Sequence, residues 1–384
     1  MKRIFIFSLI ISIICGLFFP AKAFAAPQES TSGLQVSAPS ALLMEKETGK
    51  ILYEKNAGER RPPASITKIM TMLLIVEDIE SGKISVDDIV SVSARAASFG
   101  GSCVFLEQGE RMSVDEMLKC IAVVSANDCA VAMAEYLCGT EEVFVERMNS
   151  RAQELGLKDT HFTNCTGLFK DPQHYSTAKD VAVMSRELIS HPIIKDYTTI
   201  WMDTIRGGEF GLSNTNKLVN RYEGCTGLKT GYTEDAKYCL SATAERNGME
   251  FIAVILGAKD PELRNSDAAA LLNHGFANYS LCRLRPEEEL PRLRVEMGKE
   301  DFLPLRCGGE EFSLIPKSNA EIKYELNIPE LVRAPVKKGQ ILGELIVRGG
   351  ESELARVPVI SDAEVKKIGF WGIYMKLAES LFAL

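Results

Sequence analysis

A serine and a lysine stand three residues apart in the segment PPASITKIMT, as Ser65 and Lys68. If a helix begins here, the two side chains project from the same face and can reach one another. A serine hydroxyl is a weak nucleophile until a base removes its proton. A lysine can be that base only when it is neutral, so burial or a neighbouring cation must lower its pKa. The pair is therefore a candidate nucleophile with its general base.

The S-x-x-K pattern alone is weak, because ordinary composition yields about one match in a chain of this length. Two further motifs follow it: S-A-N at residues 125–127 and K-T-G at residues 229–231. S-x-x-K, S-D-N and K-T-G occur together in β-lactamases and penicillin-binding proteins. The order and spacing of the three motifs here match that set, with Ala126 in place of the aspartate.

The helices expected around the first two motifs follow from apolar spacing and capping residues. Apolar residues recur at helical spacing from Ser65 to about Ile79. Ser113 and Glu116 form a capping box that opens a second helix, and residues 127 and 128 can cap a third. The S-A-N motif is then predicted to lie in a tight break between two helices.

Strands are expected at both ends of this helical region. Residues 40–56 have two apolar runs around turn residues and predict a hairpin. Residues 224–233, 237–248 and 249–258 predict three strands, the last two joined by an Asn-Gly turn. The fold class expected is α+β, an antiparallel sheet with a helical cluster packed on it.

The ends of the chain differ from its middle. Residues 1–25 have the layout of a secretory signal peptide, with Lys2 and Arg3 before an apolar run and small residues after it. A retained signal anchor is the alternative, although the run is somewhat short for a span of about 20 residues. Residues 30–280 are expected to form the main domain and residues 281–361, rich in short alternating runs, a small all-β domain. Whether the first segment is cleaved as a signal peptide or retained as an anchor, the protein is expected to work outside the cytoplasm.

Residues 362–384 are expected to form an amphipathic helix. Its apolar face comprises Ile368, Trp371, Tyr374, Met375, Ala378, Leu381 and Phe382. Interfacial aromatics and flanking lysines are typical of helices that lie in a membrane surface. Docking of this helix on the β domain is the alternative.

Composition excludes other classes of function. The 384 residues carry a formal charge of −8 with no basic stripe, so nucleic acid is not an expected partner. Removal of Cys15 with the signal leaves nine cysteines, an odd number that cannot all pair within one chain. No C-x-x-C occurs, and no histidine lies at zinc-ligand spacing from a cysteine pair. We expect no metal, no cofactor and no required disulfide framework.

The chain resembles the D-alanyl-D-alanine carboxypeptidases, the low-molecular-mass type of penicillin-binding protein. Beyond the three motifs, the resemblance includes TNCTGLFKDPQHYSTAKDVAVMSREL, the long segment that begins KTGYTEDAKYCL, the β-rich region and the terminal helix. It covers essentially the whole mature chain. The resemblance implies a β-lactamase/transpeptidase-like fold followed by the small β domain.

The chemistry of the residues and the resemblance imply the same roles. Ser65 attacks the carbonyl between the two terminal D-alanines of a peptidoglycan stem peptide, and Lys68 accepts its proton. Lys229, a second ammonium nearby, helps to keep Lys68 neutral. Ser125 passes a proton to the departing amine, and Asn127 orients the substrate amide and Lys68.

The remaining expected site residues recognise a substrate that ends in a carboxylate. The substrate-binding set is Asn127, Lys229, Thr230, Gly231, Tyr232 and Arg264. On the K-T-G strand, Lys229 offers a cation and Thr230 a hydroxyl, and Gly231 has no side chain to block the close approach of a ligand. Backbone N–H groups of Ser65 and Tyr232 are expected to form the oxyanion hole. Arg264 either assists carboxylate recognition or belongs to a structural ion pair.

β-Lactams are expected to inhibit this protein. No E-x-x-L-N, the signature of the deacylating glutamate in class A β-lactamases, occurs in about 40 residues after Ser125. The alternatives are a D,D-endopeptidase that cuts cross-links, a β-lactamase, and a non-catalytic penicillin-binding or wall-anchoring module. His174 is interpreted as a hydrogen-bonded structural residue.

Overall fold

The computed structural model describes residues 34–317 and 321–375. The signal peptide expected over residues 1–25 lies outside these residues, as does the terminal helix beyond residue 375. Within the two described ranges, no helix is both long and apolar enough to cross a bilayer.

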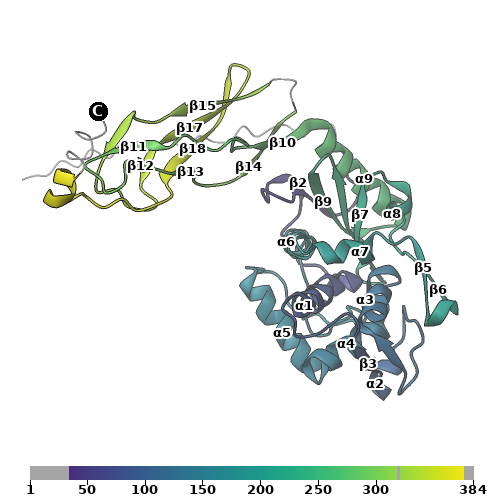
Figure 1. Cartoon of the computed structure of the whole chain (residues 1–384). Helices are drawn as coiled ribbons and strands as arrows, with labels where there is room; N and C mark the ends of the chain where they lie inside the picture. Colours follow the sequence, from purple (N-terminus) through teal and green to yellow (C-terminus); the bar gives the residue numbers. More distant parts are fainter. Residues whose placement is uncertain (1–33, 318–320, 376–384) are drawn as a thin grey trace, which may run out of the picture. The chain divides into compact units, whose positions relative to one another are not determined.

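A five-stranded antiparallel sheet forms the centre of the first domain (Figure 1). In spatial order its strands are β2 (Ile51–Lys55), β1 (Ser40–Glu45), β9 (Met249–Ala258), β8 (Lys237–Arg246) and β7 (Cys225–Thr233). Asn247 and Gly248 join β8 to β9 with φ of 53° and 74°, which a tight hairpin turn requires. The predicted α+β class and both predicted hairpins are confirmed.

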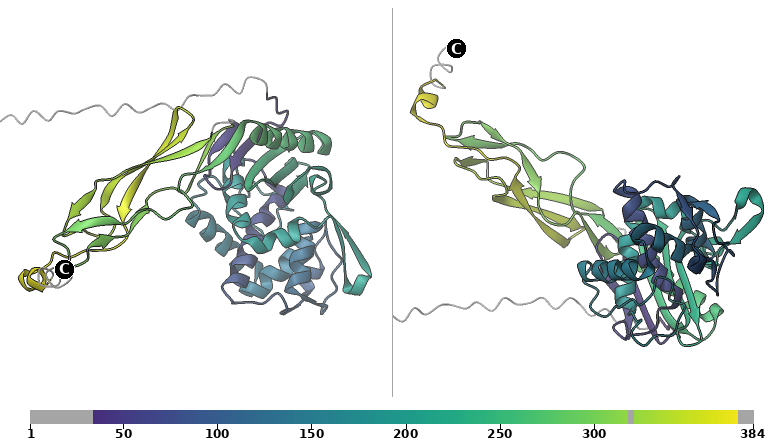
Figure 2. Two further views of the ribbon diagram at one scale, coloured as in Figure 1. Left: turned by 45° about the horizontal axis from the view of Figure 1, so that its top comes forward. Right: turned by 90° about the horizontal axis from the view of Figure 1, so that it is seen from below.

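The two faces of this sheet are covered by different helices (Figures 1 and 2). Successive strand residues point to opposite faces, so Ala41 and Leu43 pack with α9 (Pro261–Asn278) while Leu42 and Met44 join the main helical core. The helices on that second side are α1 (Lys68–Glu80), α2 (Ala94–Ala97), α3 (Val114–Val123), α4 (Asn127–Cys138), α5 (Glu141–Glu154), α6 (Ala178–Ile189) and α7 (Lys195–Thr198). The helical core therefore holds the segments that carry two of the three motifs.

Helix capping agrees with the sequence at one position and differs at another. The Ser113 hydroxyl accepts a hydrogen bond from the Glu116 N–H and starts α3, as predicted. The N-cap of α4 is Ala126, with no side-chain capping bond, so the prediction that residues 127 and 128 cap this helix is wrong. The Asp128 carboxylate instead accepts the N–H groups of Val104 and Leu106, each at 3.1 Å, because it is buried against that loop.

Short elements complete the first domain. They are β3 (Ile89–Ser91) with β4 (Arg111–Ser113), β5 (Met202–Ile205) with β6 (Phe210–Ser213), and the helix α8 (Leu218–Arg221). A 3₁₀ turn, η1 (Ala64–Thr67), precedes α1. This turn is where the first motif begins.

The region after α9 consists of strands up to residue 361 and has a hydrophobic cluster of its own, which agrees with the all-β part of the predicted fold class; the domain boundary expected at residue 281 stays a prediction. Its strands are β10 (Tyr279–Arg283), β11 (Leu293–Glu296), β12 (Phe302–Leu303), β13 (Leu305–Cys307), β14 (Phe312–Pro316), β15 (Ile322–Asn327), β16 (Leu331–Arg333), β17 (Ile341–Gly349) and β18 (Ser352–Ser361). The largest sheet of this region has four strands in the order β13-β18-β17-β15, and in another sheet β11 pairs with β16 in parallel. Leu345, Val347, Val357 and Val359 lie in its core.

The sequence predicts a helix over residues 362–384, and in the described part of this segment the prediction is wrong for residues 362–369. Val365 bridges to Val336 and Lys367 to Gly298, so this part of the segment is paired with the β domain. Residues 370–375 are helical. Phe370 and Trp371 are 77% and 75% exposed, so the described end of the chain presents large aromatic rings to its surroundings.

Candidate active site

Ser65 lies on the 3₁₀ turn η1, and the α-helix begins only at Lys68. Pro62 and Pro63 lead into this turn, where a missing backbone N–H is tolerated. Ala64 has a φ of 49°, unusual for a residue with a side chain, so the chain bends sharply just before the serine. The bend leaves Ser65 partly exposed while Ala64 and Ile66 beside it are buried.

The Lys68 side chain is completely buried and turned toward Ser65. Its Nζ lies 3.1 Å from Ser65 Oγ, 2.6 Å from Asn127 Oδ1 and 2.9 Å from the carbonyl oxygen of Thr166. Burial lowers the pKa of Lys68 to about 7, against the opposing effects of Cys165, Cys103 and Asp128. A large fraction of Lys68 is therefore neutral near neutral pH and able to accept the serine proton.

The S-A-N motif lies where α3 ends and α4 begins, and its Asn127 side chain accepts a hydrogen bond from the same amine. Ser125 has a φ of 65°, and among the described residues its buried Oγ has no hydrogen-bond partner. Asn127 is held at both ends, because its Nδ2 donates to the Gly100 carbonyl at 2.8 Å while its Oδ1 accepts from Lys68. An unpartnered buried hydroxyl is costly and calls for a functional explanation.

The K-T-G motif lies on β7, beside η1. A Cβ atom on Gly231 would lie 3.0 Å from the Pro63 carbonyl oxygen and 3.1 Å from the Ser65 nitrogen, so a side chain here would push the turn of Ser65 away from the strand. Lys229 is 1% exposed and donates to the Thr230 carbonyl. The Thr230 hydroxyl donates to Thr215 Oγ1 at 2.7 Å. The strand thus brings a buried amine next to the nucleophile's turn.

Burial and mutual repulsion act on the two lysines of the site. Burial lowers the pKa of Lys229 well below its ordinary value, and the charges of Lys68 and Arg264 lower it further. For Lys68 itself, burial is the cause of the lowered pKa. The expectation that Lys229 helps to keep Lys68 neutral stays a prediction: burial lowers the pKa of both amines, and positive charge on one disfavours positive charge on the other.

The last two expected residues occupy different environments. Arg264 is 6% exposed, and no carboxylate pairs with it in the described residues; its Nε donates to Asn265 Oδ1. Burial lowers its pKa. Tyr232 is 46% exposed, its hydroxyl donates to Glu234 and its ring packs on Tyr238. The Tyr232 side chain thus bonds to residues beyond the K-T-G motif, so any contribution to the site comes from its backbone.

The sequence reasoning missed the loop that holds Lys68 in place. The Asn164 side-chain oxygen accepts the N–H groups of Thr166 and Gly167 at 3.1 and 2.6 Å. These bonds shape the loop so that the Thr166 carbonyl oxygen meets Lys68 Nζ. The run T-N-C-T-G at residues 163–167 is rich in residues that make such local turns, and that composition was the available signal.

His174 supports the nucleophile's turn from the other side. The Thr163 N–H donates to His174 Nδ1 at 3.1 Å, so Nε2 carries the hydrogen and donates to Thr67 Oγ1 at 2.7 Å. The Thr67 hydroxyl donates in turn to the Ala64 carbonyl at 2.8 Å. Burial lowers the pKa of His174 to about 4, so this chain of bonds persists at neutral pH. The interpretation of His174 as a hydrogen-bonded structural residue is confirmed.

We expect His174→Ala to slow acylation of Ser65 by roughly tenfold, since a lost buried hydrogen bond costs about 1–3 kcal/mol. His174→Gln, which keeps a donor near Nε2, should retain most of the rate. The measurement is the second-order rate constant for acylation by penicillin at a temperature where all variants are folded. His161→Ala is the matched control, because the His161 ring contacts the Gln173 carbonyl and the Tyr175 ring and has no hydrogen bond to the turn of Ser65 among the described residues. Equal rates for His174→Ala and the wild type would contradict a positioning role.

A cavity of about 310 Å³ adjoins the turn. Its lining includes Pro63, Ala64, Leu168, Phe169 and Thr233. Lys170 and Asp235 form an ion pair at its rim with an Nζ–Oδ1 distance of 2.9 Å. The space next to Ala64 is largely apolar and can receive part of a bound ligand beyond the reacting bond.

Comparison with known proteins finds two family matches and several similar chains. The family described as D-alanyl-D-alanine carboxypeptidase matches residues 25–260, and the penicillin-binding protein 5 C-terminal domain matches residues 286–367. D-alanyl-D-alanine carboxypeptidase DacF of Bacillus subtilis is 43% identical over 377 residues, 96% of each chain. The crystal structure of penicillin binding protein 5 from Haemophilus influenzae superposes with a TM-score of 0.75 at 31% identity, covering 87% of this chain and 98% of that one. Penicillin-Binding Protein D2 from Listeria monocytogenes, solved in an ampicillin-bound form, gives a TM-score of 0.58 at 34% identity, over 63% of this chain and 99% of that one.

Proposed function

Because the chain belongs to the D-alanyl-D-alanine carboxypeptidase family of serine-type hydrolases, we propose that it removes the terminal D-alanine from peptidoglycan stem peptides through an acyl-enzyme on Ser65. The observation that carries this proposal is the partly exposed Ser65 Oγ, 3.1 Å from the buried Lys68 Nζ. A nucleophile paired with a base of pKa about 7 is suited to attack near neutral pH.

In the acylation step, neutral Lys68 takes the Ser65 proton as the oxygen attacks the carbonyl between the two D-alanines. Negative charge develops on that carbonyl oxygen, and the backbone N–H groups of Ser65 and Tyr232 are the proposed donors to it. The carbon–nitrogen bond then breaks, Ser125 donates its proton to the departing amine, and the Lys68 ammonium returns a proton to Ser125. The unpartnered Ser125 Oγ supports this role, since its bonding capacity is free for the reaction.

Recognition of the substrate carboxylate is assigned to Lys229, Thr230 and Arg264. The charge of Arg264 lowers the pKa of Lys229, so the two cations act on the same region. A bound carboxylate favours the protonated form of Lys229, because an opposite charge offsets the cost of burial. The extra positive charge on Lys229 then disfavours a proton on Lys68. Substrate binding would thus help to make the base available.

We expect slow hydrolysis of the acyl-enzyme that a β-lactam forms on Ser65, because of the groups that surround it. In the described part of the chain, the hydrogen-bond partners of Lys68 are Ser65, Asn127 and the Thr166 carbonyl, with no carboxylate among them. Among the described residues, no carboxylate is therefore hydrogen-bonded to the Ser65–Lys68 pair to activate water for a penicilloyl group. We expect ampicillin to inhibit, in line with the ampicillin-bound form of the Listeria monocytogenes relative.

The proposed place of action is the outer face of the cytoplasmic membrane. The signal-peptide pattern over residues 1–25 supports export. The exposed rings of Phe370, Trp371 and Tyr374 support peripheral contact of the terminal segment with the membrane surface. Fractionation of cells that produce the full chain and a chain ending at residue 361 tests this contact, which predicts that only the full chain sediments with membranes.

The test of the function uses mass spectrometry of the purified protein with penicillin and, separately, with diacetyl-Lys-D-Ala-D-Ala. The expected result is a penicilloyl adduct on Ser65 and release of one D-alanine per peptide, both lost in Ser65→Ala. Ser81→Ala is the matched control, because Ser81 lies at the opposite end of α1. An adduct without D-alanine release, together with cleavage of cross-linked muropeptides, would instead support a D,D-endopeptidase.

A further inference from the structure

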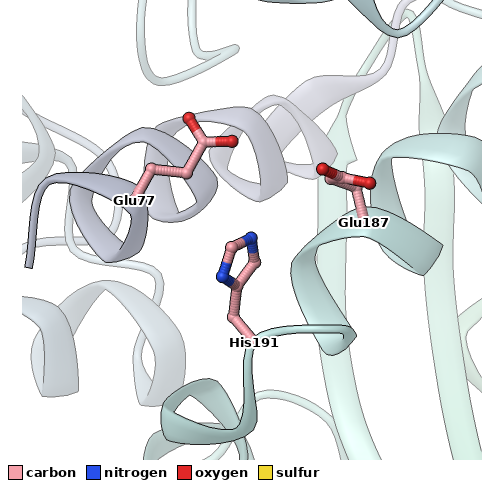
Figure 3. Close-up of side chains that lie close together, drawn as sticks. All are labelled: Glu77, Glu187 and His191. Atoms are coloured by element: carbon pink, nitrogen blue, oxygen red, sulfur yellow. The ribbon is translucent and has the colours of Figure 1, made fainter. Parts of the chain in front are cut away.

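A second cluster of chemically active side chains lies at the far end of α1. Glu77 of α1, Glu187 of α6 and His191 just beyond α6 come together there (Figure 3), with one potential ligand atom of each within 4.8 Å of the others. Glu77 is nine residues along the helix from Lys68, or about 14 Å at 1.5 Å per residue. The cluster is therefore separate from the candidate active site.

Glu80 orients the ring of the histidine. The His191 Nδ1 lies 2.6 Å from Glu80 Oε2, so Nδ1 donates to this carboxylate and Nε2 is the ring nitrogen left for another partner. Nε2 is buried, and within the described residues it has no hydrogen-bond partner. Figure 3 shows the outer nitrogen of the ring turned toward the space between the two carboxylates. A carboxylate behind the ring of a ligating histidine is the usual arrangement at protein metal sites.

Arg151 holds the carboxylates of Glu77 and Glu187 in place through one oxygen atom of each. Arg151 Nε donates to Glu77 Oε1 at 2.8 Å, and its Nη2 donates to Glu187 Oε1 at 2.7 Å. Each carboxylate thus keeps Oε2 for another partner. With Glu80 included, three carboxylates surround the histidine and Arg151 offsets only part of their charge. The site is therefore electronegative, and its ligating groups are positioned by other side chains.

We propose that Glu77, Glu187 and His191 bind a divalent transition-metal ion, with Zn²⁺ the best match. One imidazole nitrogen and two carboxylate oxygens are common zinc ligands, and water can complete a four-coordinate site. The ligand atoms must draw closer than their present spacing, which rotation of the two long glutamate side chains permits. The ion joins the end of α1 to the end of α6. The sequence did not indicate this site, because its residues are far apart in the chain and no cysteine pair is involved.

The ion is expected to stabilise the fold without assisting the reaction. A ligand that binds only the folded state raises its stability in proportion to the logarithm of ligand concentration over Kd. The acylation rate should not change, because Ser65 and Lys68 lie at the other end of α1.

The test is calorimetric titration of the chelator-treated full chain with ZnCl₂, together with its thermal unfolding with and without the metal. We expect one equivalent to bind and Tm to rise. His191→Ala and Glu187→Gln should each weaken binding tenfold or more and abolish the rise in Tm. His274→Ala is the matched control, because His274 lies on α9 and contacts Asn278 and Tyr279. Two variants are used so that misfolding of one leaves the test intact.

Cobalt substitution distinguishes this site from zinc captured by thiols, since the described chain contains nine free cysteines. Co²⁺ at the proposed site should give weak visible bands without the intense thiolate charge-transfer absorption, and these bands should disappear in His191→Ala. The proposal is overturned if no Zn²⁺ binds at millimolar concentration, if binding persists in both variants, or if thiolate absorption dominates. The cluster would then be an ion-pair network only.

Discussion

Acylation of Ser65 by penicillin is expected to slow about tenfold for each pH unit below about 7, with the dependence carried by Lys68. The pKa of Lys68 is lowered to about 7, and only its neutral form accepts a proton. As pH falls through that value the neutral fraction falls in proportion, while above it the rate should level off. His174, with a pKa of about 4, remains neutral through this range and contributes no step.

Lys68→Met should greatly lower the rate of penicilloylation and should also abolish the dependence of this rate on pH. The substitution keeps an apolar chain of similar length in the buried site while deleting the base, and general base catalysis typically contributes about 10²- to 10⁴-fold. The measurement is the penicilloylation rate from about pH 5 to pH 9, with mass spectrometry used to monitor the adduct. Lys50→Met, at an exposed turn, is the control and should match the wild type. A wild-type rate that stays flat across pH 7 would show that Lys68 is not the titrating base.

Gly167→Ala is expected to destabilise the protein by about 3–5 kcal/mol and to impair acylation severely. Gly167 has a φ of 74°, and a Cβ there would lie 1.9 Å from the Ala64 carbonyl oxygen and 2.6 Å from Thr67 Oγ1. Both contacts belong to the turn that carries Ser65. The neighbouring Thr166 carbonyl holds Lys68, so relief of the overlap must move the nucleophile's turn, the lysine's partner, or both.

Gly82→Ala separates the two causes of this effect. Gly82 has nearly the same φ, 72°, but nothing lies within 4 Å of the position of its missing Cβ. We expect it to lose only the about 1–2 kcal/mol that a left-handed residue with a side chain costs, with normal acylation. Urea unfolding and penicilloylation rates compare the two variants. Equal losses of unfolding free energy would show that packing against Ala64 is not decisive.

The sequence predicted the elements whose signals are local. The Ser113 cap, the Asn247-Gly248 turn and the hairpin of residues 40–56 each depend on neighbours within a few positions, and the structure has all three. Capping at residues 127 and 128 was predicted from the same kind of signal and is wrong. Asp128 finds better partners in the N–H groups of a loop more than 20 residues earlier, and no local pattern reveals that competition.

By itself the sequence determined the chemical groups of this protein: a serine and a lysine on one helix end, an S-A-N break, a K-T-G strand, and the order of elements that bears them. The tertiary structure decided how those groups behave. Lys68 became a base of pKa about 7 because packing removed water from it, and its position depends on the carbonyl of Thr166, 98 residues away. Glu77, Glu187 and His191 likewise meet only when α1 and α6 pack together. Burial and contacts between distant segments arise from the whole fold, and these set the pKa values and distances on which chemistry depends.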